Sequence, residues 1–327
     1  ADTDTDGDTD TDTDGDTDSD TDSDSDTDTD GDTDTRAVVV GHGNVGLDVC
    51  RVLMRTNEGR ARTDIAEPAA RALSASRIQR THFCGRRGAL DAKFTNVELR
   101  ELGALTRARP LVDAADLDVA EPDSSDRDGR LKRKNLETLR SFVDLPGDKP
   151  GEIRIRFNLQ PVEILGGERV EALRFEHTRV EGGKSIGLGT FEEIPCGLVV
   201  LAVGYRSQAI TGLPFDDEAG IIPNDGGRVD EGVYVSGWIR RGPRGVISTN
   251  RQDGGEVAKR LLAEVEPKGA AGREGLEALM ADRHIGAVNY ADWKQIDAHE
   301  VQSATDGAPR RKLVTREALM DVLAKAR

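Results

Sequence analysis

The stretch VVVGHGNVGLDVCRVL, residues 38–53, constrains the fold of this chain more than any other. A short apolar, β-branched run leads into a loop with Gly-x-Gly-x-x-Gly spacing, and apolar residues at helical spacing follow from Asn44 to Arg55. The loop glycines are Gly41, Gly43 and Gly46. A buried strand that turns through such glycines into a helix is typical of an α/β dinucleotide-binding fold, in which helix amides face the pyrophosphate.

The choice of dinucleotide depends on the end of the second strand. We expect that strand over 78–84, after a helix-like stretch at 64–73, and it ends in Gly-Arg-Arg-Gly. An NAD site places an acidic residue here, whereas Arg86 and Arg87 suit a 2′-phosphate through bidentate, charge-assisted hydrogen bonds. An ordinary basic turn is the alternative. The arginine pair favours NADP over NAD.

The first 35 residues form a low-complexity tail. Every even position from Asp2 to Asp34 is aspartate, which makes 17, and Thr, Ser or Gly fill most of the odd positions. Without these aspartates, 44 acidic residues face 45 basic ones, so the net charge of −16 belongs to the tail. Asp-rich hexapeptides ending in glycine resemble the start of a calcium loop, but the bidentate glutamate and flanking helices are lacking. We therefore predict a disordered tail over residues 1–35.

The remaining residues, about 290, suffice for one large or two ordinary domains. The longest apolar run is too short to span a bilayer, and no signal peptide is recognisable. Three cysteines, Cys50, Cys84 and Cys196, have neither metal-ligand nor Cys-x-x-Cys spacing. These features predict a reduced, cytoplasmic protein with no metal, no membrane contact and no nucleic-acid partner.

Four blocks in the chain, in this order, resemble the adrenodoxin-reductase type of ferredoxin–NADP reductase, a glutathione-reductase-like flavoprotein with two dinucleotides. The blocks are VVVGHGNVGLDVCR (38–51), GRRGALDAKFTNVELREL (85–102), AVGYRSQAITGLPFD (202–216) and GWIRRGPRGVISTN (237–250). The resemblance runs from about Thr35 to the C-terminus and includes YADWKQID (290–297) and KLVTREAL (312–319).

The resemblance implies NADP and FAD as cofactors, and electron flow from hydride through flavin to a ferredoxin-like iron–sulfur protein. Besides Gly41, the residues that it places at the nicotinamide nucleotide are His42, Gly43, Asn44, Val45, Arg86, Arg87 and Glu98. Those that it places at FAD are Trp238, Gly245, Val246 and Ile247, with Gly245 also near the nicotinamide. His42 replaces a more usual amide side chain, which predicts a mildly pH-sensitive affinity, and Gly46 replaces a usual alanine.

Catalytic candidates are few. Asp48 and Glu101 are the carboxylates that we expect nearest the nicotinamide, and a solvated helix carboxylate or a helix cap is the alternative for each. No redox-active cysteine pair is present, which favours direct transfer from flavin to the acceptor.

The resemblance also implies an FAD glycine loop earlier in the chain, where the aspartate repeat stands instead. We therefore expect a Rossmann-like, three-layer NADP-binding domain at 36–204 and the incomplete returning part of an FAD-binding domain, with covering helices, at 205–327. We therefore expect the sequence to be a fragment or a split gene product with low affinity for the flavin. A separate chain would then supply the missing loop. The competing functions are a stand-alone NADP-binding module or inactive remnant, and a subunit of a larger enzyme such as glutamate synthase.

Periodicity predicts the remaining elements. Alternating patterns at 151–157 and 170–180 indicate antiparallel strands of a small meander, and 198–203 indicates a buried strand. The stretch 113–134 reads as a loop that leads into a helix to about 143. Further helices are expected at 255–264, 273–282 and 315–325.

Overall fold

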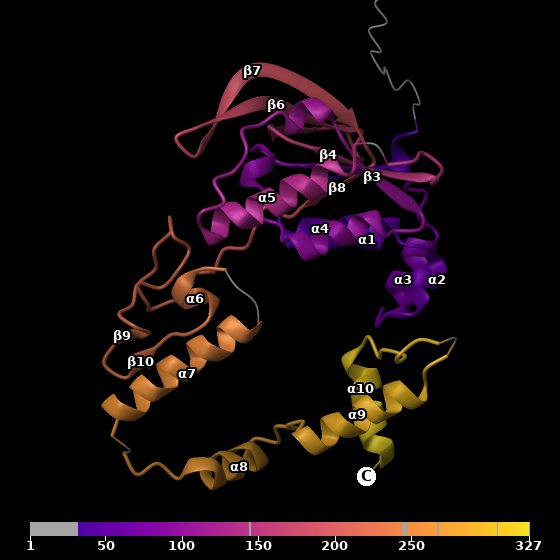
Figure 1. The fold of residues 1–327 in the computed structure, drawn as a ribbon. Coiled ribbons are helices and arrows are strands. Elements are labelled where there is room, and N and C mark those ends of the chain that lie inside the picture. The colour runs from indigo at the N-terminus through magenta and orange to yellow at the C-terminus, as the bar shows by residue number, and fades with distance from the viewer. Residues whose placement is uncertain (1–31, 144, 244–246, 267, 306, 327) are drawn as a thin grey trace, which may run out of the picture. The chain divides into compact units, whose positions relative to one another are not determined.

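A parallel sheet of five strands organises the first half of the described chain (Figure 1). The structure, a computed structural model, describes residues 32–143, 145–243, 247–266, 268–305 and 307–326. The strands are, in spatial order, β3 (Ala108–Val112), β4 (Gly151–Arg156), β2 (Arg80–Cys84), β1 (Arg36–Val40) and β8 (Leu198–Leu201). Every neighbouring pair is parallel, so the expected α/β fold is confirmed.

The two faces of this sheet carry different layers. One face is covered by helices α1 (Asn44–Met54), α4 (Asn96–Gly103) and α5 (Arg127–Arg140). The other face packs against an antiparallel meander of β5 (Leu159–Leu165), β6 (Ala172–Glu181) and β7 (Lys184–Pro195). Figure 1 shows α1 and α4 on one side of the sheet and β6 and β7 on the other. The expected three layers are therefore helices, parallel sheet and meander.

Strand β1 shows why its sequence is apolar from Ala37 to Val40. Ala37 and Val39 pack among the helices, whereas Val38 and Val40 pack against the meander. All four residues are buried. A strand covered on both faces needs apolar side chains at every position rather than at alternate ones.

The prediction that 151–157 belongs to an antiparallel meander is wrong. This segment is β4, which lies parallel between β2 and β3. The charged residues that alternate along this segment suggested a strand with one solvent-exposed face. In the structure, the Glu152 carboxylate instead pairs with arginines of the neighbouring strands, Arg80 at 3.1 Å and Arg109 at 3.0 Å. The meander instead consists of β5, β6 and β7, of which β6 confirms the prediction for 170–180.

Two further predictions need correction at the ends of segments. Strand β8 is an edge strand rather than a buried one: Leu201 is 61% exposed and Val203, just beyond it, 68%.

The predicted disordered tail is also too long, because Thr33–Thr35 form a short 3-10 helix, η1, and Asp34 pairs with Arg77 at 2.6 Å. The rest of the predicted tail, residues 1–31, lies outside the described residues.

Small elements and helices complete the described chain. In the first half they are α2 (Asn57–Ala61), α3 (Glu67–Ser74), η2 (Ala89–Asp91) and η3 (Ala114–Leu117). In the second half they are β9 (Arg228–Asp230), β10 (Val233–Tyr234), α6 (Trp238–Arg241), α7 (Ile247–Glu264), α8 (Gly272–Asp282), α9 (Tyr290–Gln302) and α10 (Arg316–Ala326). The expected helices near 255–264, 273–282 and 315–325 correspond to α7, α8 and α10. Among the described residues, no helix combines the length and apolar character that crossing a bilayer requires.

Candidate nucleotide and flavin sites

The glycine loop between β1 and α1 has the geometry of an anion cradle. Gly41 has a φ of 119°, and a Cβ there would lie 2.3 Å from the Ala202 oxygen. A Cβ at Gly46 would lie 2.4 Å from the Gly41 oxygen, whereas one at Gly43 would meet nothing within 4 Å. Gly43 caps α1 without a side-chain hydrogen bond. The first and third glycines therefore permit close packing, and the second faces open space at a helix N-terminus.

His42 lies in this loop, but its ring turns into the protein. The imidazole packs edge-on against Phe83 and Phe157, with ring centroids 4.6 and 4.8 Å away. Its Nε2 lies 2.9 Å from the Phe83 carbonyl oxygen, which can only accept a hydrogen bond, so Nε2 carries the proton. Burial lowers the pKa of His42 to about 4. The ring is therefore neutral at physiological pH, which argues against a contribution of His42 to a pH-sensitive affinity.

The arginine loop, defined as Gly85–Gly88, follows β2 beside the cradle. Arg86 is exposed and Arg87 partly buried. The meander holds the main chain of this loop, because the Arg86 oxygen accepts hydrogen bonds from the hydroxyls of Thr178 at 2.9 Å and Ser185 at 2.7 Å. Sequence reasoning missed both hydroxyl residues, since they lie about 90 residues or more from Arg86 and carry no local signal.

The buried side-chain atoms that lack a hydrogen-bond partner in the described structure include Arg87 Nε of this loop and Glu98 Oε2. Glu98 lies in the first turn of α4, and the Asn44 side chain of the cradle accepts a hydrogen bond from Thr95 at the start of that helix, at 2.8 Å. Buried polar groups are normally paired, so a donor and an acceptor left unpaired beside an open cradle fit a polar ligand. A nucleotide meets this requirement, because its phosphate oxygens accept hydrogen bonds and its hydroxyl groups donate them.

Asp48 and Glu101 come together through a third residue. Arg51 pairs with Asp48 at 2.8 Å and also with Glu101, and so joins α1 to α4. Both carboxylates are largely exposed. Val45 is 49% exposed on the first turn of α1. These contacts show an ion-pair link between α1 and α4, an arrangement that the sequence did not predict for either carboxylate.

Of the predicted flavin residues, Trp238 begins α6. Trp238 is 42% exposed and stacks on Tyr205, with ring centroids 5.8 Å apart and planes 27° apart. Gly245 and Val246 lie outside the described residues, and Ile247 begins α7. Asp253 of α7 accepts hydrogen bonds from the Gly237 amide and from Arg240, which ties α6 to α7. A cavity of about 690 Å³ borders these helices and is lined in part by Arg240, Arg241 and Asp253.

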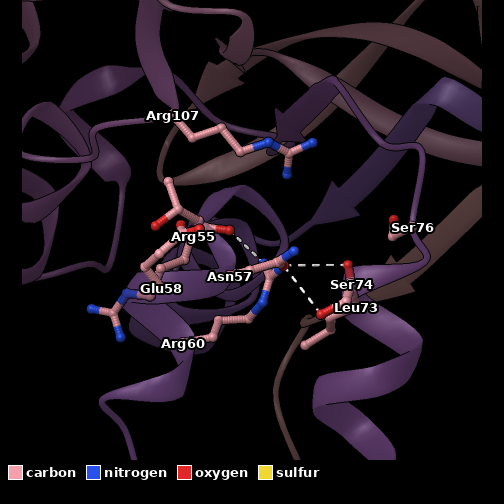
Figure 2. Close-up of a pocket in the computed structure, with 9 residues that line it drawn as sticks. Arg55, Asn57, Glu58, Arg60, Leu73, Ser74, Ser76 and Arg107 are labelled. Carbon is pink, nitrogen blue, oxygen red and sulfur yellow. Dashed lines mark hydrogen bonds between the residues drawn. The ribbon is translucent and has the colours of Figure 1, made fainter. Parts of the chain in front are cut away.

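A second cavity, of about 250 Å³, lies at the other end of α1 (Figure 2). Arg60 lines it and donates hydrogen bonds to the main-chain oxygens of Val52, Arg55 and Leu73 and to Asn57. These bonds tie the end of α1 to α2 and α3. Because helix α1 has 11 residues, this cavity lies about 16 Å from the cradle. It is a structural junction and not part of the nucleotide site.

Within the described residues, no three His, Cys, Asp or Glu side chains group as a metal site. The thiols of Cys50, Cys84 and Cys196 are free and buried. Burial raises the pKa of all three thiols, which keeps them protonated.

Comparison with known proteins identifies the family. No family model matches the chain. Rat mitochondrial NADPH:adrenodoxin oxidoreductase is 37% identical over 311 residues, and the match covers 88% of this chain and 63% of the rat protein. NADPH-ferredoxin reductase FprA of Mycobacterium tuberculosis is 37% identical over 310 residues, with 88% of this chain and 67% of FprA covered.

The solved structure of Mycobacterium tuberculosis FprA in complex with NADPH matches with a TM-score of 0.82 and 37% identity. That match covers 89% of this chain and 68% of FprA. The chain thus spans about two thirds of the length of these relatives. Sequence, order of blocks and fold agree, and the chain belongs to the family of NADPH:adrenodoxin oxidoreductases and FprA-type NADPH-ferredoxin reductases.

Proposed function

We propose that the chain acts in an NADPH:ferredoxin-type oxidoreductase, with NADP and FAD as cofactors and a ferredoxin-like iron–sulfur protein as electron acceptor. The names of the relatives support the activity, and FprA has been solved with NADPH. The observation that carries the proposal is the open space at Gly43, together with two buried polar atoms that lack a hydrogen-bond partner, Arg87 Nε and Glu98 Oε2.

Each residue of the site has a proposed role. The amides at the start of α1 bind the pyrophosphate, with Gly43 leaving room for it. Arg86 and Arg87 bind the 2′-phosphate, and Glu98 accepts a hydrogen bond from the nucleotide. Bound FAD accepts hydride from NADPH and releases electrons singly to the acceptor. The exposed ring of Trp238 supplies a stacking surface for the flavin.

The competing proposals receive less support. Similarity to reductases over 88% of the chain favours a reductase over a stand-alone NADP-binding module. A separate chain that supplies a flavin loop has no support among the relatives. The division into domains at 36–204 and 205–327 stays a prediction, as do the roles of the individual site residues.

The double variant Arg86→Ala/Arg87→Ala tests the nucleotide site. Each lost charge-assisted hydrogen bond is worth about 1.5–3 kcal/mol, so NADP affinity should fall by at least about tenfold. NAD affinity should stay unchanged, because NAD has no 2′-phosphate. Calorimetric titration of both nucleotides measures this, and Arg62→Ala/Arg71→Ala removes the same charge from exposed positions as a control. Equal losses for NADP and NAD would contradict the assignment.

A turnover assay separates the reductase from the stand-alone module. NADPH-dependent reduction of ferricyanide is measured with FAD in excess, because the sequence holds a single Gly-x-Gly-x-x-Gly loop. We expect a rate that requires FAD and falls in Trp238→Ala. Tight NADP binding without any FAD-dependent reduction would favour the module instead.

A further inference from the structure

We propose that His42 is a positioning residue for the 2′-phosphate: its ring sets the spacing between the cradle and the arginine loop. This inference rests on the proposed function, in which the cradle binds the pyrophosphate and Arg86 and Arg87 bind the 2′-phosphate. It assigns the side chain of His42 to the protein interior rather than to the nucleotide.

The contact that carries the proposal lies between His42 and Gly85. A Cβ built on Gly85 would lie 2.4 Å from Nδ1 and 2.7 Å from Cγ of the His42 ring. The imidazole therefore lies directly against the main chain of the arginine loop, where no side chain fits. A glycine is required at this position by the ring opposite it and not by its own backbone conformation, since its φ is not positive.

The ring is itself held firmly on the other sides. Phe83 and Phe157 pack against it, Phe94 lies 6.0 Å away between ring centroids, and the Phe83 carbonyl fixes Nε2. The His42 main chain is also anchored, because its oxygen accepts a hydrogen bond from the Lys93 amide at 2.7 Å. Because the ring is held in this way, a shift of the cradle would also shift the ring surface against which Gly85 packs.

The meander anchors the arginine loop from the opposite direction. The amide of Leu159 donates to the Gly85 oxygen at 2.9 Å, and that of Asn158 to the Arg87 oxygen at 3.2 Å. These bonds fix the loop against the outer layer but do not relate it to the cradle. Because the pyrophosphate and the 2′-phosphate belong to one ligand, the two anion sites must lie at a fixed spacing. The Gly41 amide donates to the Cys84 oxygen at 2.8 Å, just before the arginine loop, and beyond this main-chain bond the His42 ring packs against Gly85.

The neutral state of the ring agrees with this role. With a pKa near 4, His42 carries no charge at neutral pH and adds no attraction for phosphate. We therefore expect its effect on affinity to come through position rather than charge. A contact residue that bound phosphate directly would instead strengthen binding as the pH falls through 6.

The test compares NADP and NAD affinities in His42→Ala. We expect NADP affinity to fall by about tenfold and NAD affinity by less than about twofold, because only NADP uses both anion sites. His42→Phe, which keeps a ring of similar breadth, should retain most of the preference for NADP. A merely structural role would lower both affinities together, and that result would overturn the proposal.

Two further variants make the test independent of a general loss of stability. In an Arg86→Ala/Arg87→Ala background, His42→Ala should cause no further loss of NADP affinity. Gly85→Ala should lower NADP affinity by itself, and addition of His42→Ala should restore part of it, because removal of the ring makes room for the new methyl group. Additive losses in either pair contradict the proposal.

The outcomes for the proposed function stay distinct. If the wild-type chain binds NADP and NAD equally, the proposed 2′-phosphate site is ruled out. If the wild-type chain prefers NADP and the His42→Ala variant keeps this preference, only the proposed role of His42 is ruled out.

Discussion

The glycines of the cradle have different surroundings, so substitution at each one has a different consequence. Gly41 adopts a positive φ and has the Ala202 carbonyl against it, whereas Gly43 adopts an extended conformation that any residue can take. Spacing alone identifies all three glycines but does not show which of them serves the fold and which the ligand.

This difference predicts that folding and binding separate in two matched variants. Gly41→Ala should lower the free energy of unfolding by more than about 1–3 kcal/mol, since backbone strain adds to a clash with Ala202. Gly43→Ala should leave the melting temperature nearly unchanged but reduce NADP affinity by about tenfold, since the methyl group enters the space before α1. Thermal unfolding and calorimetry measure the two effects, and a stable Gly41→Ala variant would contradict the packing argument.

At the scale of elements, the sequence predicted what local chemistry determines. The order of strand, glycine loop and helix at β1 and α1 is local, and so is the arginine pair after β2. The position of β4 in the sheet cannot be predicted from nearby residues. The charged residues of β4 pair with arginines of β2 and β3, which precede it by at least 40 residues. The exposed edge of β8 and the hydroxyls of Thr178 and Ser185 escape sequence reasoning for the same reason.

The link between α6 and α7 yields a prediction about the flavin surface. Asp253 is 5% exposed and accepts hydrogen bonds from Gly237 and Arg240, so Asp253→Ala removes the buried partner of the Arg240 guanidinium and leaves it with the more exposed Glu256 carboxylate, 4.0 Å away. Breaking a buried ion pair costs about 3–5 kcal/mol, and α6 should detach from α7. In a Trp293→Phe background the emission of Trp238 should shift to the red. Asp282→Ala, at an exposed position, is the control, and an unchanged spectrum in Asp253→Ala would contradict this link.

At the scale of the whole molecule, two neutral histidines make stability sensitive to acid. Burial, together with the positive charges of Arg156, Arg154, Arg80 and Arg36, lowers the pKa of His82 to about 3. His42 has a pKa of about 4 for reasons of burial. In the unfolded chain both return to about 6.5, so the unfolded state binds more protons once the pH falls below that value.

Stability should therefore be constant above about pH 6.5 and decrease as the pH falls towards 4. Each histidine contributes at most about 1.4 kcal/mol per pH unit. Urea unfolding at about pH 6.5 and pH 5 measures this loss, in a window where most carboxylates stay ionised. His42→Gln should reduce the slope, while His284→Gln, at an exposed position, should not. A slope that is unchanged in His42→Gln would show that this ring is already charged in the folded protein.

The position of β4 between β2 and β3 also governs the order in which the sheet can assemble during synthesis. Strands β2 and β3 are not neighbours, so the emerging chain up to residue 150 holds a β1–β2 pair and a third strand with no partner in the sheet. Strand β3 becomes hydrogen-bonded only when β4 leaves the ribosome, and β8 joins later still. Nascent chains that stop before residue 151 should therefore remain open to proteases at β3, and those that extend through residue 201 should be protected.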